Sequence, residues 1–135
     1  MRDIKFRGRK EGSRVWDYGG YSKIGDKAFI ISIGEDRISY TAYLRESDPN
    51  TIGQYTGLKD KNEVEIYEGD IMEIQYLDFD EYIIGYVFYN EKGAKFLICD
   101  PSDDLPYDFE DFPSDKFEVI GNIHDNPELL KEVEV

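Results

Sequence analysis

The chain has 135 residues, enough for one domain, and 15% of them are aromatic, which favours a β fold. Its net charge of −14 disfavours contact with a phosphate backbone, so direct nucleic-acid binding is not expected. With one cysteine and one histidine, the chain can form no intramolecular disulfide, no thiolate zinc site and no histidine-rich metal site.

The acidity is concentrated in the second half of the chain. Residues 1–77 carry 12 Lys and Arg against 14 Asp and Glu, whereas residues 78–135 carry 4 against 16. This surface favours solubility, or alternatively a basic partner. The first ten residues lack the apolar stretch of a signal peptide, and no apolar run approaches the roughly 18 residues that cross a membrane. We therefore expect a soluble cytoplasmic protein that does not bind membranes.

Residues 1–50 predict a series of N-terminal strands. Residues 3–7 alternate, with Ile4 and Phe6 on one face and charged residues on the outer face. A second strand begins at Val15 and is expected to end at the Gly19–Gly20 breaker. Two more strands are predicted, at residues 28–33 and 37–46.

Residues 51–99 predict a hairpin followed by an antiparallel meander. Residues 53–58 form the first strand, residues 59–62 the turn, and Val64 and Ile66 share one face of the return strand. Gly69–Asp70 is a tight connection into the next strand. Three further strands are predicted, at residues 71–76, 82–89 and 94–99.

Residues 100–116, named here the acidic segment, break this pattern with three prolines and seven acidic residues. We expect an irregular loop, because four bulky side chains are costly to leave in water: Leu105, Tyr107, Phe109 and Phe112. The alternative is a mobile segment whose aromatic side chains engage a basic groove. Its candidate interaction residues are Asp103, Asp104, Tyr107, Asp108, Phe109, Glu110 and Asp111.

The last residues, 117–135, predict a closing strand and a short helix. The strand covers residues 117–120, and Asp125 or Asn126 caps a helix that starts at Pro127. The frequent turns are typical of a small antiparallel barrel. We therefore predict one mainly β domain over residues 1–135.

The sequence contains few signals of catalysis. It has no phosphate-binding loop, no HExxH motif and no nucleophile elbow. Asp78, Asp80 and Glu81 suggest calcium, but the run lacks the glycine and distal glutamate of an EF-hand loop. Cys99 is interpreted as a small core hydrophobe. A carboxylate-based enzyme is a minor alternative, and we expect no enzymatic activity, no cofactor and no metal.

The best candidate for a buried polar network or site is a set of carboxylates with two tyrosines: Glu65, Glu68, Asp70 and Glu73, with Tyr55 and Tyr67. The alternative, which we favour, is a group of strand-edge charges with an Asp70 that satisfies a tight turn. A set of candidate interaction or structural residues in this region is named here the signature: Gln54, Tyr55, Tyr67, Glu68, Gly69 and Asp70.

Several stretches along the whole chain carry a family resemblance. They are IGQYTGLKDKN at 52–62, EIYEGDI at 65–71, KFR at 5–7, VWDYG at 15–19 and VIGNIHDNPELL at 119–130. With these motifs the chain resembles the YopX family of small bacteriophage and prophage proteins. That resemblance implies a mostly β domain of phage or prophage origin, with no assigned activity and no catalytic residues to transfer.

Two positions depart from the family pattern. Glu63 stands where the family usually has glycine, and a glutamate adopts positive φ only at a cost, which suggests another turn type. His124 stands where the family commonly has tyrosine, which argues against a catalytic base. Residues 68–71 together with Gly85-Tyr86-Val87 also look like part of an SH3-like barrel, a fold that mostly binds other molecules.

Two functional hypotheses follow. The first is a non-enzymatic phage or prophage accessory protein that binds a host or phage protein, or a second copy of itself as a homo-oligomer, through aromatic side chains and edge strands. The second is an acidic decoy that mimics nucleic acid and occupies the DNA-binding face of a host protein. Salt separates them, because decoy binding weakens steeply with ionic strength.

Overall fold

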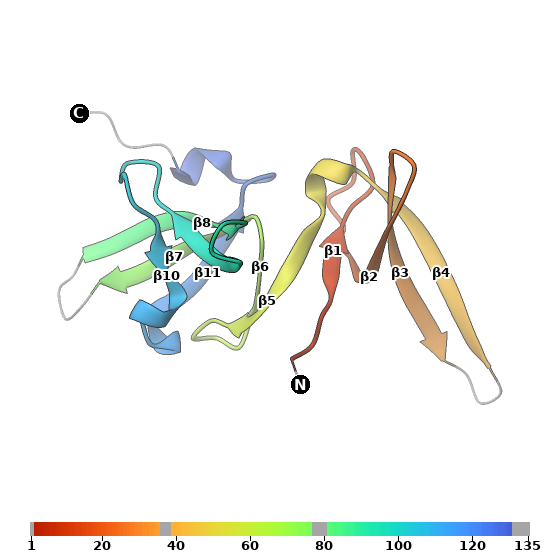
Figure 1. Cartoon of the computed structure of the whole chain (residues 1–135), viewed down its shortest axis with the longest axis horizontal. Helices are drawn as coiled ribbons and strands as arrows, with labels where there is room; N and C mark the ends of the chain where they lie inside the picture. Colours follow the sequence, from red (N-terminus) through yellow and green to blue (C-terminus); the bar gives the residue numbers. More distant parts are fainter. Residues whose placement is uncertain (1, 36–38, 77–80, 131–135) are drawn as a thin grey trace. The chain divides into compact units, whose positions relative to one another are not determined.

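The computed structural model describes residues 2–35, 39–76 and 81–130, which form a mainly β fold with two antiparallel sheets. The chain divides into two compact units, unit 1 (residues 1–55) and unit 2 (residues 56–135) (Figure 1). The strands are β1 (Phe6–Gly8), β2 (Asp17–Ile24), β3 (Lys27–Glu35), β4 (Tyr40–Ser47), β5 (Gly53–Lys59), β6 (Glu65–Tyr67), β7 (Asp70–Tyr76), β8 (Glu81–Asn90), β9 (Lys95–Cys99), β10 (Tyr107–Asp108) and β11 (Phe117–Asn122). Short 3-10 helices are η1 (Pro49–Thr51), η2 (Phe109–Asp111), η3 (Ser114–Lys116) and η4 (Pro127–Leu130).

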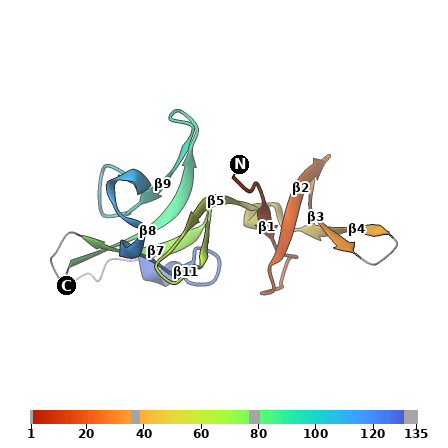
Figure 2. The same cartoon turned by 90° about the horizontal axis from the view of Figure 1, so that it is seen from below.

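Unit 1 is built on strands in the order β4-β3-β2-β1, with the start of β5 beside β1. Strands β2, β3 and β4 form one layer (Figures 1 and 2). The predicted strands at 28–33 and 37–46 correspond to β3 and β4, except that residues 36–38 lie outside the described residues. One face of this layer buries Ala28, Ile30 and Ser47. The rings of Phe6 and Tyr21 meet near this face, with centroids 5.4 Å apart.

The expected break at Gly19–Gly20 is wrong, because β2 continues through both glycines to Ile24. Gly19 has a φ of +154°, and a Cβ atom on it would lie 2.1 Å from the carbonyl oxygen of Ile31. Glycine is therefore required here by the close approach of the β3 backbone, and not by a turn.

The charged outer face expected for the first strand is also wrong. Arg7 and Arg9 are buried, with exposed fractions of 6% and 8%, whereas Ile4 is 63% exposed. Both guanidinium groups lie over the ring of Trp16, 4.3 Å and 4.8 Å from its centroid. A planar guanidinium stacks on an aromatic face and is weakly hydrated, so arginine tolerates this position.

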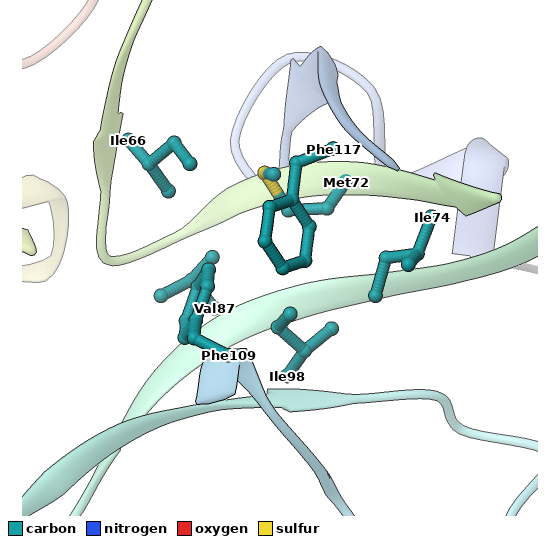
Figure 3. Packing of buried hydrophobic residues seen from close by; sticks show 7 residues of the cluster. All are labelled: Ile66, Met72, Ile74, Val87, Ile98, Phe109 and Phe117. Atoms are coloured by element: carbon teal, nitrogen blue, oxygen red, sulfur yellow. The ribbon is translucent and has the colours of Figure 1, made fainter. Parts of the chain in front are cut away.

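Unit 2 contains the end of β5 with β6, and a sheet of strands in the order β10-β9-β8-β7-β11. The predicted strands at 71–76, 82–89, 94–99 and 117–120 are confirmed as β7, β8, β9 and β11. The buried core lies against this sheet (Figure 3), and the Phe109 and Phe117 ring centroids are 5.3 Å apart. Its members are Ile66, Met72, Ile74, Val87, Ile98, Phe109 and Phe117.

The barrel and the C-terminal helix differ from expectation. Within the described residues both sheets are open and neither closes into a barrel. The edge strand β10 has only two residues, and the prolines of the acidic segment lack the N–H that a longer strand needs. The expected short helix is a single 3-10 turn, η4. Asp125 Oδ2 and Asn126 Oδ1 accept hydrogen bonds from Asn122, at 3.1 Å and 3.3 Å.

The turn between β5 and β6 places Glu63 in the left-handed region, with a φ of 64°. Glu63 therefore adopts the positive φ that a glutamate reaches only at a cost. Val64 remains in the turn and is 46% exposed, so it does not share the buried face of Ile66 as predicted. Its N–H donates to Asp60 Oδ1 at 2.9 Å.

Replacing Glu63 with glycine should stabilise unit 2 relative to replacing it with alanine. Only glycine adopts positive φ without a steric cost, and we expect a difference of about 1 kcal/mol in the free energy of unfolding. Both variants remove the exposed ion pair with Lys59 equally. Urea denaturation of the two variants measures the difference, and equal stabilities would contradict the strain assigned to Glu63.

Candidate functional site

The second face of the β2-β3-β4 layer is the most unusual surface of unit 1. Directly paired residues of an antiparallel sheet point to the same side. The pairs Ile31 with Leu44 and Ile33 with Ala42 therefore lie on one face, opposite to Ile30. We name this surface the apolar face; its residues are Ile24, Phe29, Ile31, Ile33, Tyr40, Ala42 and Leu44.

The large side chains of the apolar face are unusually exposed. The exposed fractions are 57% for Ile24, 66% for Ile33, 73% for Tyr40 and 55% for Leu44. Every residue of β4 except Ser47 is exposed. A sheet normally buries its apolar face against a second layer, so this face has the character of a contact surface.

The strand β4 adds an unprotected edge to this surface. It is the terminal strand of its sheet, it has eight residues, and it contains no proline, glycine or lysine. The edges of the unit 2 sheet differ, because β10 has two residues and β11 carries an irregularity between Val119 and Gly121. Short or bulged edge strands resist pairing with another chain, and β4 is neither short nor bulged.

Sequence reasoning missed the apolar face, although one signal was present. In residues 28–33 apolar residues occupy both alternating positions, so a single-layer strand must leave one set exposed. The alternation of Tyr40, Ala42 and Leu44 predicted a strand but not which side would be covered. That outcome depends on the absence of a second layer, which local pattern does not encode.

The six signature residues are divided between the two units. Gln54 and Tyr55 lie on β5 in unit 1, where Tyr55 N donates to Lys5 O at 2.8 Å. Lys5 Nζ lies 5.1 Å from the centroid of the Tyr55 ring. These contacts anchor the first residues of β5 to the start of the chain.

The other four, Tyr67, Glu68, Gly69 and Asp70, form the turn between β6 and β7 in unit 2. The buried Asp70 Oδ2 accepts a hydrogen bond from Tyr67 N at 2.8 Å. Gly69 has a φ of 87°, which glycine adopts without strain. This geometry matches the structural interpretation of Asp70 as the acceptor of a tight turn.

Asp60 is a polar residue that sequence reasoning treated only as part of a turn. It is 3% exposed. Its Oδ1 accepts from the N–H groups of Asn62 and Val64 at 2.8 Å and 2.9 Å, and its Oδ2 from Val119 N at 2.9 Å. One carboxylate thus joins the β5–β6 turn to β11. Its role is structural.

The acidic segment is packed at its aromatic side chains and exposed at most of its carboxylates. Phe109 is 8% exposed and lies in the core, so it is not available as an interaction residue as predicted. Tyr107 and Phe112 pack against that core, whereas Leu105 is 75% exposed and anchors nothing. The exposed acidic side chains of this segment are Asp103, Asp104, Glu110, Asp111 and Asp115.

Local partners lower the pKa of two carboxylates of this segment. Tyr107 Oη donates to Asp103 Oδ2 at 2.6 Å, and this bond lowers the pKa of Asp103. Lys95 Nζ donates to Asp108 Oδ2, which lowers the pKa of Asp108 and raises that of Lys95. Asp108 Oδ1 also caps η2 by accepting from Glu110 N at 3.0 Å.

These shifts predict that acid weakens the attachment of the acidic segment. A carboxyl group with a lowered folded-state pKa contributes stability above its unfolded pKa, near pH 4, and loses it as pH falls through the folded value. We therefore expect the wild type to lose more stability between about pH 5 and about pH 2 than a Lys95→Met, Tyr107→Phe variant. Thermal melting of both proteins over this range measures the difference. Identical losses in both proteins would contradict this assignment. The effect is small, because both carboxylates are near solvent.

The remaining candidates for chemistry form no site within the part of the chain that the structure describes. Cys99 is half-buried and not a full core residue, and its hydrogen bond with Tyr86 raises the pKa of that tyrosine. Asp78 and Asp80 lie outside the described residues. Within residues 2–35, 39–76 and 81–130, no three His, Cys, Asp or Glu side chains are arranged to hold a metal ion. The same residues contain no helix long and apolar enough to cross a membrane.

Comparison with known proteins identifies the family of the chain. No curated protein matches it significantly. Among solved structures, the crystal structure of protein EF1440 from Enterococcus faecalis is similar, with a TM-score of 0.61 and 25% sequence identity. That match covers 97% of this chain and 100% of the other. The family model described as YopX protein matches residues 5–131, nearly the whole chain, and therefore the chain belongs to the YopX family.

Proposed function

We propose that this protein is a non-enzymatic interaction module, a phage or prophage accessory protein that binds another protein chain in the bacterial cytoplasm. The observation that carries the proposal is the exposure of the apolar face. Tyr40 and Ile33 are 73% and 66% exposed on a layer whose opposite face is buried in part, at Ala28, Ile30 and Ser47. Aromatic and aliphatic side chains of this kind form the centres of protein interfaces.

The charge distribution supports this location for the contact. Unit 1 carries ten Lys and Arg against eight Asp and Glu, whereas unit 2 carries six against 22. The apolar face therefore lies on the nearly neutral unit, where a partner can approach without strong long-range repulsion.

A purification experiment tests the proposal. The tagged wild type, a Leu44→Lys variant and a Tyr82→Lys control are each recovered from the phage-infected host at low and at high salt. Leu44 and Tyr82 are similarly exposed, at 55% and 56%, but Tyr82 lies in unit 2. We expect a bound protein that survives high salt, is lost with Leu44→Lys and is retained with Tyr82→Lys. Retention of the bound protein by Leu44→Lys would contradict the proposal.

A second candidate function is an acidic decoy that mimics nucleic acid. It is supported by the exposed carboxylates of the acidic segment, which are held on a segment fixed to the core through Phe109. Neutralising Asp103, Asp104, Glu110 and Asp111 to Asn or Gln tests it. If the protein is a decoy, its partner is lost both from this variant and at high salt. A partner bound through the apolar face is retained in both cases.

A further inference from the structure

We infer that the apolar face is occupied by a second copy of this chain, packed face to face as a two-fold symmetric dimer. The inference rests on the proposed function, because it names the partner for the same surface. The alternatives are an unrelated protein at the apolar face and pairing of two β4 edges, and the experiment below distinguishes them.

The area of the apolar face agrees with a dimer interface. Four large side chains that are more than half exposed, with the smaller and half-buried members, offer roughly 600 Å² of apolar surface per copy. A stable interface buries about 800 Å² per partner, with an apolar centre and a polar rim. The apolar face therefore supplies the centre, and adjoining residues such as Ser22 supply the rim.

The charges on this side of the layer favour a partner with the same surface. Among the described side chains of β2, β3 and β4 that point to this side, the charged ones are Lys27 and Glu46. They pair with each other at 3.8 Å, so this side of the layer carries no net charge from them. The described side chains on this side therefore offer no complementary charge to a strongly basic or acidic partner, whereas those of a second copy are equally neutral.

The symmetry of a sheet sandwich agrees with this arrangement. Two sheets packed face to face keep their strands within about 30° of each other and bury the inner side chains of both. A two-fold axis gives each copy the same contacts, so one exposed face is sufficient for both partners. Burial of Ile33, Tyr40 and Leu44 in this way would supply a second layer over the side that the described residues of unit 1 leave exposed.

The net charge of the whole chain predicts how self-association depends on salt concentration. Two copies at −14 each repel one another, and added salt screens that repulsion. Self-association through the apolar face should therefore strengthen as salt rises from about 50 mM to about 500 mM. Binding of a basic partner through the acidic segment would instead weaken as salt rises.

Sedimentation equilibrium of the full-length wild type, Leu44→Lys and Thr41→Lys tests the inference. Both substitutions add one positive charge to an exposed position of β4, but Thr41 lies opposite Gly34 on the other side of the layer. We expect the wild type to approach twice its 15.8 kDa mass at high concentration. Leu44→Lys should raise the dimer dissociation constant about a hundredfold, because both copies then bury an unpaired charge, and Thr41→Lys should change it less than about threefold. Circular dichroism confirms that each variant is folded, and Ile33→Lys serves as a second face variant.

Two results would overturn the inference. A wild type that remains at 15.8 kDa up to about 1 mM excludes a functional dimer. Equal weakening by Thr41→Lys and Leu44→Lys assigns the contact to the β4 edge, because edge pairing through the backbone does not distinguish the two faces. If the chain is monomeric and Leu44→Lys still loses a protein captured from the host, the inference fails but the proposed function stands. If neither self-association nor capture depends on Leu44, both fail.

Discussion

Replacing Asp60 with alanine is expected to lower the free energy of unfolding of unit 2 by about 3–4 kcal/mol. The carboxylate accepts three backbone hydrogen bonds, from Asn62, Val64 and Val119, and is 3% exposed. Alanine leaves these donors without their acceptor, and hydrogen bonds to a charged group are among the stronger ones. The turn would also lose its bond to Val119 of β11, 59 residues away in the sequence, and would keep the backbone bond from Lys61 N to Phe117 O.

The measurement is urea denaturation of the wild type, Asp60→Ala and Asp100→Ala. Asp100 makes the same kind of local bond to a backbone N–H, that of Ser102, but in an exposed position. We expect Asp100→Ala to cost less than about 1 kcal/mol. Because the single tryptophan, Trp16, lies in unit 1, the unfolding of unit 2 is best followed by amide exchange in β7 and β8. Equal effects of the two substitutions would contradict the central structural role of Asp60.

Replacing Gly85 with alanine should lower the free energy of unfolding of unit 2 by about 2–3 kcal/mol. Gly85 lies on β8, and a Cβ atom there would be 2.6 Å from the carbonyl oxygen of Cys99 and 2.8 Å from Cγ2 of the buried Ile98. Both atoms belong to β9, and the closer one is backbone, so β8 and β9 would have to separate. The substitution therefore strains the middle of the sheet over the core.

Gly93→Ala is the matched control for this prediction. Gly93 lies in the exposed turn between the same two strands, and an added Cβ there meets only the side chains of Asn90 and Lys95 at 3.3 Å and beyond. We expect a change within about 0.5 kcal/mol, because flexible exposed side chains can move. If Gly85→Ala were equally mild, the close approach of β8 and β9 would be wrong.

The strands were predictable wherever local sequence alone determines them. Gly69 precedes β7, Asn90 ends β8, and Gly93 and Pro101 flank β9, so the predicted ranges agree with the structure within a few residues. The Gly69–Asp70 turn was also predictable, because an aspartate can accept a backbone N–H three residues earlier. In these places sequence pattern and tertiary structure agree.

The features that were not predictable depend on contacts between distant parts of the chain. The burial of Arg7 depends on the Trp16 ring, over which its guanidinium lies. Glycine is needed at position 19 because the carbonyl oxygen of Ile31 approaches it closely. The tether from Asp60 to Val119 cannot be found from local spacing. Above all, the alternation of β4 predicts a strand but cannot indicate that one side of the layer stays uncovered.

The most direct test of the central claim is carbene footprinting of the wild-type chain, free at low concentration and in its bound state. Tyr40 and Leu44 report on the apolar face, and Tyr82, which is 56% exposed in unit 2, is the internal reference. We expect the labelling of Tyr40 and Leu44 to fall several-fold in the bound state and that of Tyr82 to stay unchanged. Unchanged labelling of Tyr40 and Leu44, with protection of the acidic segment instead, would contradict it.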